Sequence, residues 1–469
     1  MRLENYMVSF QLDILIREDV NYLKIGLRMS SHYEKTGKTH EGSWNDRRPP
    51  AQNQRRNYKM TSSDDRKTIT PPRVSIPIGP QHPALKEPGM FKLTVEGERI
   101  IDAEVNIGYN HRGIEKLTEQ KTFTQILYLV ERICGICSAT HNGNFAQASE
   151  FAAEVDISDR AKFIRTLTWE LERIHSHILW LGVAFHEVGF DTAFMYTWRD
   201  REVVMDMLED LSGNRVNYAM NTVGGVRRDV SDELKLRLLK GLDHLEERME
   251  YYRDVAIYEK TFWDRINGVG ILPTDIAKKT SAVGPTARGS NVPVDVRFND
   301  PTMAYVHLRD SGEFEMILSD RCDIAGRAIV RVLETIQSIE MCRWLLNNLP
   351  DGPIRERVRP RIQPNEVLAR YEAPRGEVIH YLVTNGTTKP DRLKVRAPTH
   401  ANWVSMAHTL RGGYIADAPI TLAAIDPCFS CTDRVTLVDS ADESMELITL
   451  DEFRIRANKW HAANPRRIA

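Results

Sequence analysis

Two pairs of cysteines, separated by most of the chain, constrain the fold more than any other feature. The first pair is Cys134 and Cys137, in E-R-I-C-G-I-C-S-A-T-H, and the second is Cys428 and Cys431, in D-P-C-F-S-C-T-D-R. Cysteines three positions apart can direct both sulfurs to one metal, because the residues between them turn tightly. Soft sulfur ligands favour nickel, zinc, copper(I) or iron–sulfur species over hard cations. The stretch 138–427 is far too long for the loop of a small zinc ribbon, so we expect a site where the two ends of a large domain meet.

The composition limits the class of protein further. The chain has 469 residues, 42% hydrophobic and 27% charged, which is ordinary for a globular protein with one large core or two to three domains. The net charge of −2 gives no electrostatic reason to expect nucleic acid as a partner. No apolar run approaches the roughly 18–20 residues that span a bilayer, and the first residues lack the pattern of a secretory signal. Six cysteines do not suggest a disulfide scaffold, so we expect a reducing, cytoplasmic setting.

The first part of the chain differs from the rest. Ser30–Arg73 is polar and crowded with charge, and it has few large apolar residues. Such a segment buries too little surface to offset the entropy of ordering it. We therefore expect residues 1–70 to be a disordered extension. The residues before Met60 are predicted to be dispensable, with Met60 as an alternative start.

Two segments have the pattern of β-hairpins. Phe91–Val105 alternates between apolar and polar residues and turns at Gly97. Glu377–Val395 has a similar pattern around the Asn-Gly pair that ends at Gly386. The sequence therefore predicts small β elements in addition to its helices.

Three long stretches have helical periodicity. From Ser158, a suitable N-terminal cap, apolar residues recur in steps of three and four and form one face. Leu234–Ile266 and Glu313–Leu346 repeat the pattern. Cys322 and Cys342 fall in the last stretch and have no cysteine three positions away, so we interpret both as buried structural thiols. The expected fold class is mainly α with small β elements (α+β).

With the flanking residues included, the cysteine motifs resemble a known family. R-x-C-G-I-C-x-x-x-H and D-P-C-x-x-C-T-D-R are similar to motifs in the large, catalytic subunit of nickel–iron hydrogenases. Arg434, where most such hydrogenases have histidine, resembles the membrane-bound, energy-converting group (group 4), which is related to the large catalytic-arm subunit of complex I. The matching segments run from about Ile76 to Arg434. The resemblance implies a large-subunit domain over residues 71–434, built as a helical bundle with peripheral β-hairpins.

The resemblance implies the composition of the metal centre. Cys134, Cys137, Cys428 and Cys431 would all bind nickel, and Cys137 and Cys431 would also bridge to an iron that carries CO and cyanide ligands. Thiolate ligands keep nickel electron-rich, and a terminal cysteine such as Cys428, or a nearby base, would take the proton. No flavin or nicotinamide motif stands out, and the cysteines are too few to hold an iron–sulfur cluster as well.

Two further residues acquire catalytic roles only through the resemblance. The acidic residue that matches Glu87 is thought to pass protons in the family, which requires burial to raise its pKa toward the working pH. The arginine that matches Arg375 lies over the metals, where a permanent cation can stabilise the charge that builds when H2 splits. Without the resemblance, Glu87 reads as a solvated loop carboxylate and Arg375 as a surface arginine in a turn.

Other residues would surround the ligands. His141 follows Cys137 by four positions and is expected to donate a hydrogen bond to a bridging sulfur. Arg132 and Asp426 flank the two motifs, and Arg434 ends the second. Because Arg434 replaces a histidine that helps to bind a third metal in many hydrogenases, we expect no such metal here. Val435–Ala469 is a candidate maturation peptide, removed after the metal is inserted.

The implied function is reversible reduction of protons to H2 by a membrane-associated, energy-converting enzyme. S-G-N-R-V-N-Y, G-G-V-R-R-D and G-P-T-A-R-G-S look most like the ferredoxin-linked archaeal type. The implied partners are a small subunit with a four-iron–four-sulfur cluster, membrane-embedded subunits, ferredoxin, and maturation proteins that include an endopeptidase. The expected location is peripheral, on the cytoplasmic face of the membrane, without a transmembrane segment.

Other interpretations stay open. The quinone-reducing subunit of complex I shares the G-P-Q-H-P and H-R-G-x-E-K segments but lacks the cysteine pairs that this chain has. A sulfur-reducing relative with an altered metal site is a second alternative. A third, from a different class, is a non-catalytic protein with a four-cysteine zinc site. Elemental analysis separates these, since hydrogenase contains nickel and iron, the structural protein zinc, and the quinone enzyme neither.

Overall fold

The computed structural model describes residues 72–432, 437–438, 445–446 and 450–463. The chain divides into two units, Met1–Ile69 and Thr70–Ala469, and all of the described residues belong to the second. The extension predicted for residues 1–70, and Arg434, lie outside the described residues. Within the candidate maturation peptide, the described elements are β9 (Leu437–Val438), β10 (Met445–Glu446) and α15 (Leu450–Ala463).

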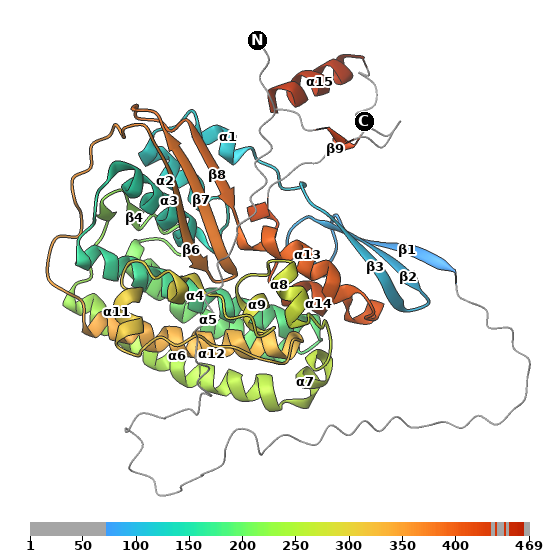
Figure 1. Cartoon of the computed structure of the whole chain (residues 1–469). Coiled ribbons are helices and arrows are strands. Elements are labelled where there is room, and N and C mark those ends of the chain that lie inside the picture. The colour runs from blue at the N-terminus through green and yellow to red at the C-terminus, as the bar shows by residue number, and fades with distance from the viewer. Residues whose placement is uncertain (1–71, 433–436, 439–444, 447–449, 464–469) are drawn as a thin grey trace, which may run out of the picture. The chain divides into compact units, whose positions relative to one another are not determined.

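Four long helices pack against one another and form the main core of the second unit (Figure 1). They are α4 (Asp159–Glu187), α5 (Asp191–Ser212), α6 (Asp232–Tyr258) and α12 (Ile324–Asn347). The prediction that α4 starts after Ser158 is confirmed, because the hydroxyl of Ser158 accepts a hydrogen bond from the backbone N–H of Ala161, 3.3 Å away. The predicted apolar face of α4 is buried in the core.

The other two helical stretches need correction at their boundaries. The second divides at Glu259, whose carboxylate accepts from Phe262 N and starts a separate helix, α7 (Lys260–Ile266). The third begins at Ile324 rather than at residue 313. The carboxylate of Asp323 caps it by accepting a hydrogen bond of 2.8 Å from Gly326 N.

The two cysteines outside the paired motifs therefore have different environments. Cys342 is buried within α12, as predicted. Cys322 precedes that helix in the left-handed backbone region, with φ of 59°. Its side chain is only partly buried, with Sγ 3.7 Å from the hydroxyl of Thr274. The interpretation of Cys322 as a buried helical thiol is wrong.

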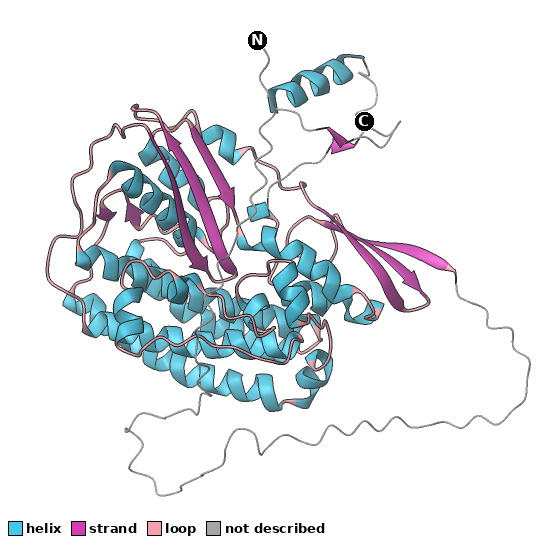
Figure 2. Cartoon of the chain, viewed as in Figure 1, coloured by secondary structure: helices cyan, strands magenta, loops and turns pink. Residues whose placement is uncertain are grey.

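Two three-stranded antiparallel sheets complete the framework (Figure 2). Both predicted hairpins are confirmed, and each gains one strand. The strands of the first sheet are β1 (Arg73–Ile78), β2 (Met90–Glu96) and β3 (Arg99–Asn106), and those of the second are β6 (Asn365–Ala373), β7 (Gly376–Thr384) and β8 (Arg392–Arg396). Gly97 has a φ of 61° in the β2–β3 turn, which glycine adopts without strain.

Shorter helices connect the sheets to the bundle. α3 (Ser138–Ala153) packs against β6 and β7, and α13 (Pro398–Leu410) packs against β3 and α14 (Ala418–Ala424). Among the helices of the described residues, none combines the length and the apolar character that crossing a membrane requires. The molecule is thus mainly helical with small antiparallel sheets, as predicted. The remaining elements are α1 (Ile114–Thr118), α2 (Phe123–Glu131), β4 (Asn221–Thr222), β5 (Gly225–Val226), α8 (Thr274–Lys279), α9 (Pro285–Arg288), α10 (Val296–Asn299), α11 (Tyr305–Asp310), η1 (Ile415–Asp417) and η2 (Ser430–Thr432).

Candidate metal centre

The two cysteine motifs meet where α3 begins and where the chain turns after α14. Cys137 directly precedes α3, and Ser430–Thr432 forms the short 3₁₀ turn η2 that contains Cys431. Arg112 joins the motifs, because its guanidinium donates to the carbonyls of Ile133 (2.9 Å) and Ser430 (3.0 Å). One arginine thereby fixes the backbones of both motifs.

The four sulfurs lie together inside the protein. Cys428 Sγ is 3.4 Å from Cys134 Sγ and 2.9 Å from Cys431 Sγ, and Cys137 Sγ is 4.0 Å from Cys431 Sγ. All four residues are buried, and none forms a disulfide. Sulfurs bound tetrahedrally to one ion at about 2.3 Å would be about 3.8 Å apart. The distance between the sulfurs of Cys137 and Cys431 is close to this value, and the sulfurs of Cys134, Cys137 and Cys431 all lie within 4.8 Å of one another, which suits binding around a metal.

The protonation of the thiols also fits a metal. Hydrogen bonds from the other three cysteines hold the pKa of the Cys134 thiol well below its usual range. Hydrogen bonding to Cys134 raises the pKa of Cys137 and Cys428, and burial raises that of Cys431. The protein alone thus favours about one thiolate among four sulfurs. A metal ion binds thiolates and displaces their protons, so this set of donors fits a soft cation.

His141 lies beside the sulfurs on the first turn of α3. Its Nε2 is 3.8 Å from Cys431 Sγ, and its Nδ1 is 3.2 Å from Nε2 of His380 on β7. Burial lowers the pKa of His141 to about 4, so the ring is neutral at pH 7. The hydrogen bond between the two histidine rings fixes the orientation of His141, whichever of the two nitrogens donates. His380 was missed from the sequence, since only the fold brings β7 to α3.

Arg375 is buried in the tight turn between β6 and β7. Its guanidinium donates to the Asp426 carboxylate (2.7 Å), to the Asp426 carbonyl (2.9 Å) and to the Ser176 hydroxyl (3.2 Å). Burial opposes the charge of Arg375, but Asp426 and the cysteine sulfurs outweigh it and raise the pKa. The second oxygen of Asp426, Oδ2, is buried and has no hydrogen-bond partner among the described residues. Arg375 therefore contacts the second cysteine motif through Asp426.

Glu87 contacts the same motif from the loop after β1. Its carboxylate accepts hydrogen bonds from the backbone N–H groups of Phe429 (2.6 Å) and Ser430 (3.3 Å), and from the Ser430 hydroxyl. The residue is half-buried rather than freely solvated. The structure therefore places this carboxylate one residue from Cys428.

A cavity of about 400 Å³ reaches this end of the site. Its polar part is formed by Cys428, Glu87, Arg375 and Asp426, together with Lys86 and His186. The rest of its wall is mainly apolar and includes Ile136, Leu179, Trp180, Val183, Phe194, Trp198 and Leu422. Small uncharged molecules can therefore approach Cys428 along an apolar surface.

One predicted neighbour of the ligands does not contact them. Arg132 is exposed, and its guanidinium donates to the carbonyl of Tyr128 at 2.6 Å. Arg112 takes the bridging position instead, which the sequence did not assign to it. Arg112 lies in the segment H-R-G-I-E-K, which the family shares. That segment is the sequence feature that could have identified Arg112, although it is not adjacent to the cysteines. Arg434 lies outside the described residues.

Comparison with known proteins agrees with this geometry. The family described as "Respiratory-chain NADH dehydrogenase, 49 Kd subunit" matches residues 187–365 and 355–434, and the family described as "Nickel-dependent hydrogenase" matches residues 112–188. The chain belongs to the family of large subunits of membrane-bound, energy-converting nickel–iron hydrogenases, which is related to the 49 kDa subunit of complex I.

Individual relatives are similar over most of this chain. It is 39% identical over 407 residues to the membrane-bound hydrogenase subunit alpha of Pyrococcus furiosus, covering 84% of this chain and 94% of that one. It is 37% identical over 379 residues to formate hydrogenlyase subunit 5 of Escherichia coli, covering 81% and 66%. A chain in the structure of the membrane-bound sulfane sulfur reductase, an archaeal respiratory membrane complex, superposes with a TM-score of 0.73 at 29% identity, covering 77% and 98%. The relatives belong to multisubunit membrane complexes.

Proposed function

We propose that this chain is the catalytic subunit of a membrane-associated, energy-converting hydrogenase that reduces protons to H2 reversibly. The observation that carries the proposal is the buried cluster of four sulfurs from opposite ends of the large domain. The similarity to the Pyrococcus furiosus hydrogenase subunit over nearly its whole length supports it.

The four cysteines would hold nickel, and Cys137 and Cys431 would also bind iron with CO and cyanide ligands. When bound, this centre supplies the site at which the H–H bond forms or breaks. Cys137 and Cys431 are suited to a shared position because their sulfurs are 4.0 Å apart. His141 would keep Cys431 in place by donating from Nε2 toward its sulfur.

The other residues would move protons and stabilise charge. Cys428 borders the cavity and would hold the proton at Sγ, and Glu87, bonded to the next residue, would exchange it with the solvent. Arg375 would stabilise negative charge on the sulfurs, since a guanidinium stays protonated. Asp426 would hold Arg375 in position through two hydrogen bonds.

Electrons would leave this chain through a partner. Of the cysteines outside the cluster, Cys322 and Cys342, one lies before α12 and the other within it, so they offer no set of four ligands for an iron–sulfur cluster. A small iron–sulfur subunit, with ferredoxin as donor, would supply the path. Membrane-embedded subunits would anchor the complex at the cytoplasmic face, and an endopeptidase would act at Arg434 during maturation.

The test is elemental analysis of the native complex with an assay of H2 evolution from reduced ferredoxin. We expect nickel and iron, infrared bands of CO and cyanide, and H2 evolution that requires the partner subunits. Zinc alone would support the non-catalytic alternative and contradict the proposal. Reduction of quinone or of sulfane sulfur without H2 evolution would move the chain to the complex I-like or sulfur-reducing branch.

A further inference from the structure

A second feature, remote in sequence from the cysteine motifs, is the arginine-rich segment Arg355–Arg361, which reads R-E-R-V-R-P-R. The backbone runs without a turn or bend from Glu356 to Arg359, and exposed and half-buried residues alternate along it. Successive side chains of an extended chain leave on opposite sides. Arg355, Arg357 and Arg359 therefore leave from one side, about 7 Å apart.

The arginines of this segment lack internal partners. All are exposed, and none forms an ion pair or a side-chain hydrogen bond with any residue in the part of the chain that the structure describes. Exposed arginines elsewhere commonly have carboxylates, and Arg237 has two within 4 Å, those of Asp210 and Glu233. Uncompensated positive charge at regular spacing is a feature that an anionic partner would neutralise.

The backbone of the segment is paired at its start and then open. Glu356 N donates to Gly224 O at 2.7 Å, and Val226 N donates to Ile354 O at 2.9 Å. A side chain at Gly224 would collide with the carbonyl oxygen of Glu356, because a Cβ there would lie 2.4 Å from it. Beyond this bridge, Arg357–Arg359 makes no backbone hydrogen bond to the described residues. Its N–H and C=O groups are available to another strand.

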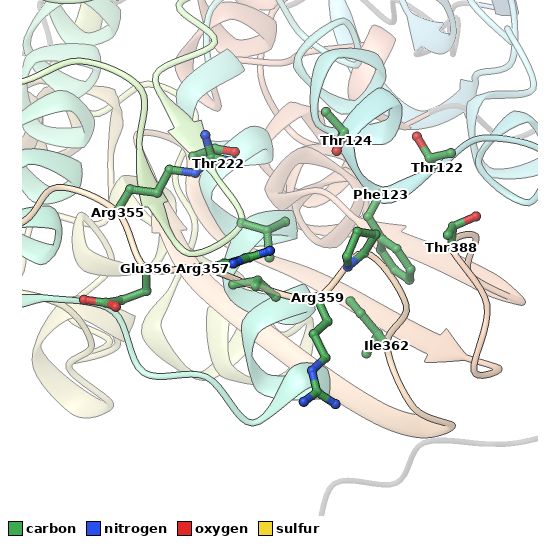
Figure 3. A pocket seen from close by; sticks show the side chains of 13 residues that line it. Thr122, Phe123, Thr124, Thr222, Arg355, Glu356, Arg357, Arg359, Ile362 and Thr388 are labelled. Atoms are coloured by element: carbon green, nitrogen blue, oxygen red, sulfur yellow. The ribbon is translucent and has the colours of Figure 1, made fainter.

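A hollow of about 550 Å³ lies along this segment (Figure 3). In the view, Arg355 extends toward Thr222, and Arg359 starts from the same wall with its guanidinium pointing away from the labelled threonines. Four threonines line it: Thr122, Thr124, Thr222 and Thr388. α2 begins at Phe123 in the same wall, so the positive end of its dipole adds to the charge of the arginines.

We propose that this hollow binds an extended, acidic segment of a partner subunit. Carboxylates on alternate residues of such a segment would match the spacing of the arginines, and its backbone would pair with the open groups of Arg357–Arg359. A free phosphate is too small to meet arginines spread over about 14 Å. The net charge of −2 gives no support for nucleic acid. The relatives are subunits of multisubunit complexes, so another subunit of such a complex could supply the acidic segment.

The first test is photo-cross-linking in the assembled native complex, with a benzoylphenylalanine at Pro360. Pro360 lines the hollow, is exposed, and carries no charge, so the arginines stay intact. We expect mass spectrometry to identify a cross-linked peptide from another subunit that is rich in aspartate and glutamate. Cross-links that form only within this chain, including those to residues 1–71, would overturn the proposal, as would cross-links only to a segment that lacks acidic residues.

The second test measures binding of a fluorescent peptide, (Glu-Thr)₅, to the purified full-length chain. We expect the R355E/R357E/R359E variant to bind about tenfold more weakly, because each exposed charge pair contributes modestly. K240E/K278E/K279E makes the same change of charge on exposed residues elsewhere and is expected to bind as the unchanged chain does.

Two peptide results would contradict the proposal. One is equal binding of (Gln-Thr)₅, which lacks the carboxylates, and the other is equal loss of affinity in both triple variants. Competition by vesicles containing phosphatidylglycerol, or by an RNA dodecamer, at lower concentrations than the peptide needs would assign the arginines to a membrane or to nucleic acid instead. Circular dichroism of all variants separates loss of binding from loss of fold.

Discussion

Two buried clusters of ionisable groups among the described residues differ in how completely the chain satisfies them. In the first, arginines and carboxylates neutralise each other. Arg288 lies 2.6 Å from Glu334 and 2.7 Å from Glu372, and Arg297 lies 2.8 Å from Asp295. In the second, four cysteines have mainly one another as partners. The arginine–carboxylate cluster thus contains its own opposite charges, whereas under the proposed function the cysteine cluster would receive its positive charge from a bound metal.

The two clusters are neighbours in the fold. His177, which bonds to Glu334 of the arginine–carboxylate cluster at 3.1 Å, is next in sequence to Ser176, which accepts a hydrogen bond from Arg375. Glu372 stands three residues before Arg375 at the end of β6. The rigid, neutralised cluster therefore supports the turn that carries Arg375 toward the sulfurs.

Loss of one sulfur should have the largest effect. In C431S, we expect bound nickel to fall to background and H2 evolution to fall by about 10³-fold or more, because the members of a catalytic unit act together. Nickel is measured by mass spectrometry of the purified complex. The control is C342A, which removes a buried thiol within α12 and should keep its nickel. Equal nickel loss in both variants would contradict a specific role of the four-sulfur cluster.

Breaking the neutralised cluster should affect stability rather than metal binding. R288M removes the cation that Glu334 and Glu372 share, leaving buried carboxylates without it. We expect a loss of about 3–5 kcal/mol in the free energy of unfolding, measured by urea denaturation. R237M, at an exposed arginine, is the control and should change the free energy by less than about 0.5 kcal/mol. If R288M lowers the free energy of unfolding by less than about 1 kcal/mol, its effect is similar to that of the exposed control. The cluster would then contribute little to stability.

Residues that orient the ligands should have an intermediate effect. We expect H141Q to lower nickel affinity or activity by about 10–100-fold, because it replaces the ring that contacts Cys431 Sγ. H177Q makes the same change in the arginine–carboxylate cluster. It should lower stability while the nickel content of the folded fraction stays the same. If H177Q loses as much nickel from folded protein as H141Q, His141 has no specific role at the sulfurs.

Much of the framework could be predicted because its signals are local. The hairpin at Gly97 and the helix that follows Ser158 have the expected periodicity and turn residues, and the structure contains both. α3 was missed because it is buried on nearly all sides and so has no apolar face. The start of α12 was placed too early because the apolar residues before Asp323 mimic helical spacing, whereas the cap at Asp323 decides the boundary.

The candidate site was predictable only in part. The four cysteines were found because their spacing has a chemical reason, and the structure brings them together. The contact between His141 and His380 joins positions far apart in sequence, and no local pattern reports it. Arg375 reads as a surface residue in a turn, and its burial follows from packing against Asp426. Such contacts are properties of the fold.

Glu131 provides the smallest and sharpest test, because it is buried but belongs to neither cluster. Neither of its carboxylate oxygens has a side-chain hydrogen-bond partner among the described residues, and the nearest cation, Arg132 Nη1, is 3.7 Å away. Burial raises its pKa from the ordinary 4.5 to about 7. Between these values the folded chain holds a proton that the unfolded chain has lost. The contribution of Glu131 to the free energy of unfolding should therefore fall as pH rises from 4.5 to 7 and stay constant above that.

E131Q removes this titration, because the amide stays neutral. We expect its free energy of unfolding to be less dependent on pH across that window, by about 1–2 kcal/mol, since relaxation reduces the penalty of a buried charge. Urea denaturation at about pH 5 and about pH 7.5, on either side of the raised pKa, measures the difference. E119Q, at a carboxylate that pairs with Lys116 on the surface, serves as the control and should leave the pH dependence unchanged. If E131Q and the unchanged chain lose equal stability between the two pH values, Glu131 is ionised in the folded protein. The fold would then accommodate a buried carboxylate charge outside both clusters.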